Sequence, residues 1–182
     1  MQALSVNFAG VIVDRQSFLD GSRVFTIEAE DRPSQGWRLM LTFRWPVVSE
    51  DVDEGDLTLV VPDGGEIYGT LAGGTATEVT NEVEESTAAR FDLDFAVSGG
   101  DGPYEQVSGR LRVTGTIAGE GVGTGGSLEG EGALITVEMW LEGAPDLSRF
   151  RPTAAIPTGQ PPPETEATAR QHPESSEPEP HA

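Results

Sequence analysis

The chain has 182 residues with 31 acidic side chains, 11 arginines and no lysine, which gives a formal net charge of −20 at pH 7. This length suits one domain with its own core, and the charge argues against a nucleic-acid backbone or an anionic membrane surface as partner. There is no cysteine, and both histidines, His172 and His181, lie near the C-terminal end of the sequence, which excludes thiolate chemistry and a histidine-based triad or metal site in the folded part.

Hydrophobic and polar residues alternate along most of the chain, which is typical of half-buried β-strands. A proline-aspartate-glycine-glycine turn, residues 62–65, separates the fourth strand from the fifth, and the fifth is expected to bend near Gly73 and Gly74. The first five predicted strands are Leu4–Val13, Arg23–Glu30, Trp37–Trp45, Asp56–Val61 and Glu66 to about Thr80.

The clearest strand pair follows, in the segment from Phe91 to Gly115. Its two halves alternate around a glycine-dense turn at Gly99, Gly100 and Gly102. Ala133–Glu142 is the eighth predicted strand, and the short stretch Asn81–Ala89 is the one place where a helix competes.

Eight strands joined mostly by short turns predict an all-β fold, either a two-sheet sandwich or a closed barrel. We favour the eight-stranded antiparallel up-and-down barrel, because closure removes exposed sheet edges. Residues 1–151 are assigned to this domain. Residues 152–182 hold eight prolines and one large hydrophobic residue, Ile156, so we expect a disordered C-terminal tail.

One segment carries a family resemblance. The run Ser98-Gly99-Gly100-Asp101-Gly102-Pro103-Tyr104, followed by Ser108-Gly109 and a strand that ends at Thr114-Gly115, resembles a turn of the allene-oxide-cyclase-like barrels. LTLVVPDGGEIYG, residues 57–69, is similar to another unit of that group. The resemblance covers about Asp56–Gly115. It implies an eight-stranded barrel with an apolar cavity that acts on hydrophobic, often polyunsaturated molecules without a metal or organic cofactor. The group includes plant allene oxide cyclases, dirigent proteins and bacterial spirotetronate Diels–Alderase-type cyclases.

The hydrophobic face of the strands supplies the predicted substrate-binding residues. They either line a cavity for one small ligand or simply fill the barrel, and periodicity alone leaves both readings open. Tyr104, at the turn after the sixth strand, is the best single candidate for a catalytic hydroxyl, although it can equally serve as a rim residue. The predicted lining residues are Trp37, Leu41, Phe43, Trp45, Phe91, Phe95, Leu111, Val113 and Met139.

We therefore predict a cofactor-free cyclase or isomerase of a hydrophobic, unsaturated, polyketide-like intermediate. The alternative is a non-catalytic, dirigent-like barrel that binds a hydrophobic ligand, and a filled barrel that acts through its surface or as a homo-oligomer is a third reading. No cofactor, metal, nucleic acid or membrane partner is expected. The N-terminal residues read as a strand and not as a signal peptide, so the expected location is the cytoplasm.

Overall fold

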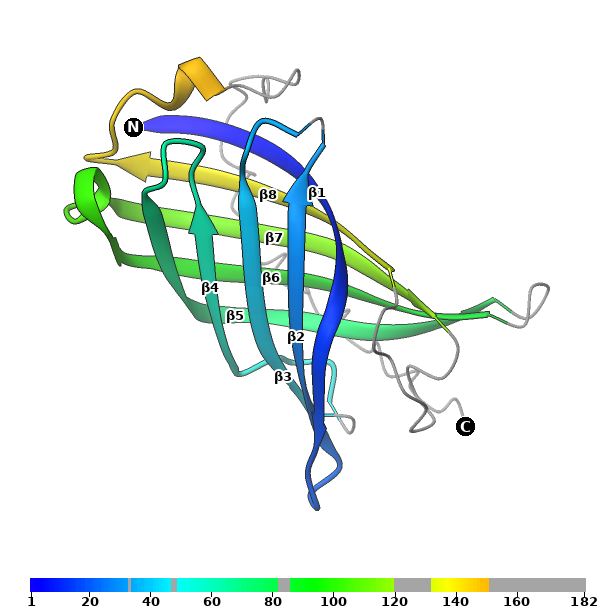
Figure 1. The fold of residues 1–182 in the computed structure, drawn as a ribbon. Coiled ribbons are helices and arrows are strands. Elements are labelled where there is room, and N and C mark those ends of the chain that lie inside the picture. The colour runs from blue at the N-terminus through cyan, green and yellow to red at the C-terminus, as the bar shows by residue number, and fades with distance from the viewer. Residues whose placement is uncertain (33, 47–48, 82–85, 120–131, 151–182) are drawn as a thin grey trace, which may run out of the picture.

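The structure, a computed structural model, describes residues 1–32, 34–46, 49–81, 86–119 and 132–150. Eight strands account for most of them, joined by turns and two short 3-10 helices (Figure 1). The strands are β1 (Gln2–Ser17), β2 (Ser22–Asp31), β3 (Arg38–Pro46), β4 (Glu54–Val60), β5 (Glu66–Asn81), β6 (Ser86–Gly100), β7 (Ser108–Gly119) and β8 (Gly132–Glu142). The 3-10 helices are η1 (Gly102–Tyr104) and η2 (Leu147–Phe150).

Each strand pairs antiparallel with its neighbour in sequence, and β1 pairs with β8, so the sheet closes into a barrel. The predicted eight-stranded up-and-down barrel is thereby confirmed, and the two-sheet sandwich is wrong. The helical alternative for 81–89 is also wrong for its described residues, because Asn81 ends β5 and β6 begins at Ser86. The predicted tail, 152–182, lies outside the described residues.

Closure depends on the length and curvature of β1. Its residues 2–11 pair with β8 and its residues 8–17 pair with β2. A register shift between Ile12 and Asp14 inserts an extra residue into the β1–β2 ladder, and such bulges bend a strand and increase its twist. A second shift between Leu71 and Gly73, where Gly73 has a φ of 155°, bends β5 at the predicted place.

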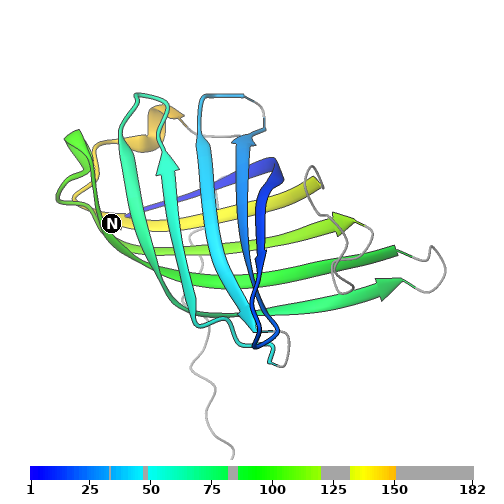
Figure 2. The same cartoon turned by 60° about the horizontal axis from the view of Figure 1, so that its bottom comes forward.

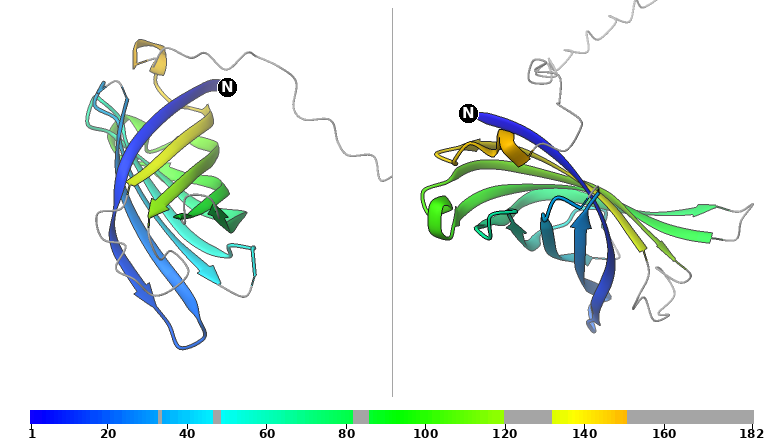
Figure 3. Two further views of the ribbon diagram at one scale, coloured as in Figure 1. Left: turned by 90° about the vertical axis from the view of Figure 1, so that its right-hand side faces the viewer. Right: turned by 45° about the horizontal axis from the view of Figure 1, so that its top comes forward.

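The two ends of the barrel differ in their connections. The N-terminus, η1 and η2 lie at one end, which we call the cap end (Figure 3). At the opposite end the β5–β6 pair projects beyond β7 and β8 (Figure 2), and the β1–β2 pair projects beyond β3 (Figure 1). The core runs between the two ends and consists of the inward-facing residues of all eight strands. In the described part of the chain, no helix has both the length and the hydrophobicity that a membrane crossing requires.

Candidate functional site

The predicted lining residues all lie in the barrel core. Each belongs to the hydrophobic core cluster and is at most 5% exposed. They come from β3, β6, β7 and β8, with Trp37 directly before β3. The structure brings them together on one continuous inner face, and their role in ligand binding stays a prediction.

Polar side chains are scarce inside. Among the described residues, Ser22 and Asp31 are the buried polar or charged side chains, and both serve the backbone or a neighbour at the ends of β2. The carboxylate of Asp31 accepts hydrogen bonds from the backbone N–H groups of Gln35, Gly36 and Trp37 at 2.8–3.2 Å. Ser22 Oγ accepts from Arg44 Nε at 3.0 Å. Both side chains are engaged in hydrogen bonds, so neither is free to act as an acid or a nucleophile.

Four aromatic rings meet at the end opposite the cap, and we call Phe25, Phe43, Trp45 and Phe91 the aromatic plug. The ring centroids of Phe25 and Phe43 are 5.6 Å apart, and those of Phe25 and Trp45 are 6.2 Å apart. The Phe43 and Phe91 centroids lie 5.4 Å apart although β3 and β6 are three strands apart around the barrel. Such distances are favourable for aromatic pairs. The rings therefore bridge the interior at this level, and a ligand there has to displace them.

Tyr104 closes the cap end. Its side chain is fully buried, and its ring lies against Gly65, where an added Cβ would overlap it. The hydroxyl donates a hydrogen bond to Asp63 Oδ2 at 3.0 Å, and Arg149 Nη2 donates to the same oxygen at 3.0 Å. Burial, reinforced by the hydrogen bond to Asp63, raises the pKa of Tyr104 to about 12. The phenol therefore stays protonated and acts as a donor, not as a base.

The residues after β8 complete the cap. Trp37 meets Phe150 edge to face with ring centroids 6.3 Å apart, and its indole N–H donates to the Phe150 carbonyl at 3.4 Å. Gln2 fixes the start of this segment by donating to the carbonyls of Ala144 and Pro145 at 3.2 and 3.0 Å. The sequence did not predict that this segment closes the cap, because Asp63 was assigned only to a turn and Arg149 was given no role.

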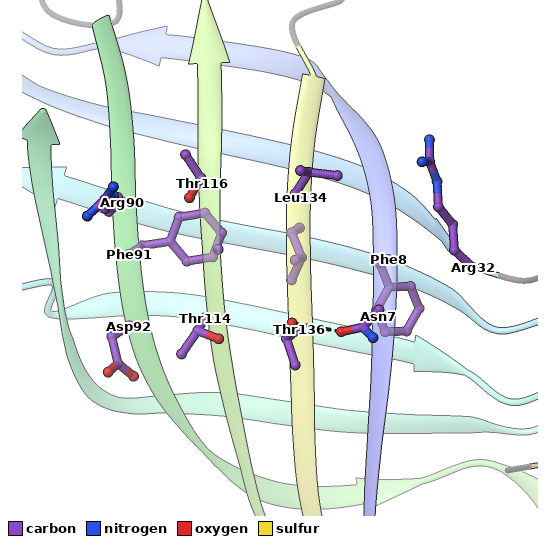
Figure 4. A pocket seen from close by; sticks show the side chains of 12 residues that line it. Asn7, Phe8, Arg32, Arg90, Phe91, Asp92, Thr114, Thr116, Leu134 and Thr136 are labelled. Atoms are coloured by element: carbon purple, nitrogen blue, oxygen red, sulfur yellow. Dashed lines mark hydrogen bonds between the residues drawn. The ribbon is translucent and has the colours of Figure 1, made fainter. Parts of the chain in front are cut away.

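A groove of about 580 Å³ lies on the outer face of β6, β7, β8 and β1 (Figure 4). Two neighbouring rows of outward residues form its floor. One row runs through Asp92, Thr114, Thr136 and Asn7, and the next through Arg90, Thr116 and Leu134. Arg32 flanks it beside β1. The sequence predicted that residues such as Arg110 and Thr114 face water, but it gave no sign that this face is hollowed.

Comparisons with family models, with curated proteins and with solved structures found no match. In the described ranges, no group of three or more His, Cys, Asp or Glu side chains is arranged to hold a metal ion. The structure thus defines the class of protein as a closed eight-stranded antiparallel barrel with a hydrophobic interior, a hydrogen-bonded cap and an aromatic plug.

Proposed function

We propose that the barrel binds one hydrophobic small molecule in its interior. The observation that carries this proposal is the closed barrel whose inner face is hydrophobic on every strand. An eight-stranded barrel of this kind is wide enough to be filled by its own side chains or to hold one small ligand. Burial of an apolar ligand against such a face is favourable by about 25 cal/mol per Å² of apolar surface.

The more specific form of the proposal is membership of the allene-oxide-cyclase-like barrels. The glycine-rich run that carries the resemblance forms the turn between β6 and β7, and it contains η1. Gly99 and Gly102 have φ values of 132° and 56° there, which favour glycine. The same turn delivers the buried Tyr104. These features support the resemblance because they give Gly99, Gly102 and the aromatic residue of the motif a structural role.

In this form the protein is a cofactor-free cyclase or isomerase of a hydrophobic, unsaturated, polyketide-like intermediate. The hydrophobic wall would hold a flexible chain in a folded shape close to its cyclisation geometry, and such pre-organisation can lower a barrier by up to about 7–11 kcal/mol. Tyr104 is the candidate group for polarising a carbonyl, since its phenol is protonated. To do so it has to exchange Asp63 for the substrate oxygen.

We place the entrance at the aromatic plug. Among the described residues, contacts between the four rings fill the interior at this end beside the hydrogen-bonded β3–β4 connection, whereas side-chain hydrogen bonds and an ion pair hold the cap. Much of the stabilisation of these ring contacts comes from apolar burial, which is non-directional, so rotated rings can pack against a ligand instead of against each other.

Binding can be tested by methyl-selective NMR with three neutral apolar probes: all-trans-retinol, farnesol and β-ionone. We expect at least one probe to shift the methyl signals of Leu41, Leu111 and Val113 in the interior. The methyl signals of Leu134, which is 63% exposed on the outer face, are the internal control and should not move. If none of the three probes affects the interior methyls, or if Leu134 responds equally, interior binding is contradicted.

Catalysis needs a separate assay. Linear polyenes that carry a conjugated diene and a carbonyl would be incubated with the protein, without added metal or nucleotide. Cyclisation or isomerisation leaves the mass unchanged but alters the retention time and the diene absorbance. A Tyr104→Phe variant that binds the same polyene but converts it at least about tenfold more slowly would assign the hydroxyl a role in polarising the carbonyl. Equal rates would remove Tyr104 from the mechanism.

A non-catalytic, dirigent-like binding protein is the second candidate. The engagement of the Tyr104 hydroxyl by Asp63 at 3.0 Å favours it, because the buried phenol already has an acceptor. Binding with 1:1 stoichiometry and no conversion of any polyene would select it. For either function we propose a cytoplasmic protein whose partner is the small molecule, with self-association left open.

A further inference from the structure

The outer groove is independent of the interior, and its charges are unusual for this chain. Acidic residues outnumber basic ones by 31 to 11, and four described arginines, Arg44, Arg110, Arg112 and Arg149, form ion pairs with carboxylates. Of the nine arginines among the described residues, Arg32, Arg38 and Arg90 are those whose side chains contact no other described side chain by an ion pair, hydrogen bond or ring contact. Two of these three, Arg32 and Arg90, line the groove.

The acidic residue of the groove is already neutralised. Asp92 accepts two hydrogen bonds from Arg112, Nε to Oδ1 at 2.9 Å and Nη2 to Oδ2 at 2.6 Å. These bonds lower the pKa of Asp92. Its charge is thus compensated within the wall, whereas the exposed guanidinium groups of Arg32 and Arg90 keep their donors for an external acceptor.

The floor offers further hydrogen-bonding groups. Thr136 Oγ1 donates to Asn7 Oδ1 at 2.9 Å, which directs the Asn7 amide so that its NH₂ group remains as a donor (Figure 4). In the described part of the chain, the hydroxyls of Thr114 and Thr116 have no hydrogen-bond partner. Leu134, beside Thr116 in the same row, adds an exposed apolar contact. Hydroxyls, an amide and an apolar patch together suit an oxygen-rich ligand with a C–H face.

The positions of the two arginines set the length of that ligand. Arg90 lies on β6, and the backbone N–H of Arg32 donates to the carbonyl of Asn7 on β1 at 2.9 Å. Arg32 directly follows β2, so β7, β8 and β1 lie between the two arginines and their backbones are four strand spacings apart, about 19 Å in total. The volume of about 580 Å³ lies within the range of small-molecule sites. We propose that this groove binds a short acidic oligosaccharide, with anionic groups at Arg32 and Arg90 and ring hydroxyls over Thr114 and Thr116.

The test is titration of the full chain, labelled with ¹⁵N, with three trisaccharides. Trigalacturonate carries carboxylates, O-sulfated maltotriose carries sulfates, and maltotriose is neutral. We expect at least one anionic trisaccharide to shift the backbone amides of Thr114, Thr116 and Leu134, and maltotriose to leave them unchanged. The anionic trisaccharide that binds more tightly shows whether the groove prefers a carboxylate or a sulfate group.

The double variant Arg32→Gln/Arg90→Gln tests the arginines, and Arg38→Gln is the matched control because Arg38 is exposed on β3 and pairs with no other described side chain. We expect at least about a tenfold loss of affinity in the double variant and a change below about twofold in the control. Equal losses in both, shifts outside the groove, or no shift with either anion would overturn the proposal. All three arginines are exposed, so an unchanged melting temperature verifies that each variant is folded.

Discussion

The cap end and the plug end of this barrel are sealed by different forces. At the cap, Tyr104 and Arg149 both donate to Asp63 at 3.0 Å, and the Trp37 indole donates to Phe150. Near the plug, four aromatic rings from β2, β3 and β6 contact one another with centroids 5.4–6.2 Å apart. Buried side chains form hydrogen bonds inside the cap, whereas at the plug the rings fill the interior and the hydrogen bonds lie beside them in the backbone, from Val52 N–H to the Gly74 carbonyl at 2.9 Å and from Ala76 N–H to the Glu50 carbonyl at 2.7 Å.

This difference bears on how a ligand reaches the interior. A hydrogen bond specifies one arrangement, and a buried polar group that loses its partner costs about 1–3 kcal/mol. Ring packing depends on apolar contact and tolerates several arrangements of similar energy. The plug is thus the end where rearrangement costs less free energy, which is why we propose it as the entrance.

The largest effect is expected from removing the ring at the centre of the plug. Phe43 is 1% exposed and contacts both Phe25 and Phe91. Truncation to alanine removes buried apolar surface and leaves a cavity, which for phenylalanine costs about 3–5 kcal/mol. The urea-unfolding free energy of Phe43→Ala should fall by this amount. Phe43→Leu, which keeps more volume, is the control, and equal, small losses in both variants would show that the rings do not seal this end.

An intermediate loss of stability is expected when a methyl group is added at a glycine beside the cap or beside the plug. A Cβ added at Gly65 would overlap the ring of Tyr104, and one added at Gly115 would overlap the ring of Phe91 and lie 2.9 Å from the backbone carbonyl oxygen of Leu134. Overpacking of this kind costs about 1–3 kcal/mol. The Tyr104 ring is held at its hydroxyl by Asp63, so it cannot easily move away, whereas the Phe91 ring has no such bond.

We therefore expect both Gly65→Ala and Gly115→Ala to destabilise the protein in urea unfolding, the second also because the Leu134 carbonyl cannot move aside. In a Tyr104→Phe background, the added cost of Gly65→Ala should shrink, because the ring is then free to shift. A strictly additive double variant would mean that the hydrogen bond does not restrain the ring.

The strands and the inner face were predictable because both follow from a local pattern. Alternation assigned Phe43, Phe91 and Leu111 to the interior, and the structure places all three there. The meeting of Asp63, Tyr104 and Arg149 was not predictable, since these residues come from three separate connections that only the closed barrel brings together. The groove was missed for a similar reason. Alternation tells which side faces water, but the hollow depends on how β1, β6, β7 and β8 bend.

The smallest effect at neutral pH is expected from Tyr104→Phe, which removes one hydrogen bond while Arg149 still donates to Asp63. The cost should be about 0.5–1.5 kcal/mol. At high pH the stability difference between the wild type and Tyr104→Phe reports directly on the phenol. The unfolded tyrosine titrates near pH 10, and the folded pKa is raised to about 12, so the protonated phenol favours the folded state. This contribution is complete below about pH 10 and is lost as the pH rises to about 12.

Wild-type stability should therefore fall relative to that of Tyr104→Phe between about pH 10 and pH 12, by about 2 kcal/mol. Tyr68 is present in both proteins, so its titration cancels in the difference. Urea unfolding at closely spaced pH values measures this difference directly. Parallel stability curves across the window would mean that burial and Asp63 do not protect the phenol, and the Tyr104–Asp63 hydrogen bond would no longer distinguish the cap from the plug.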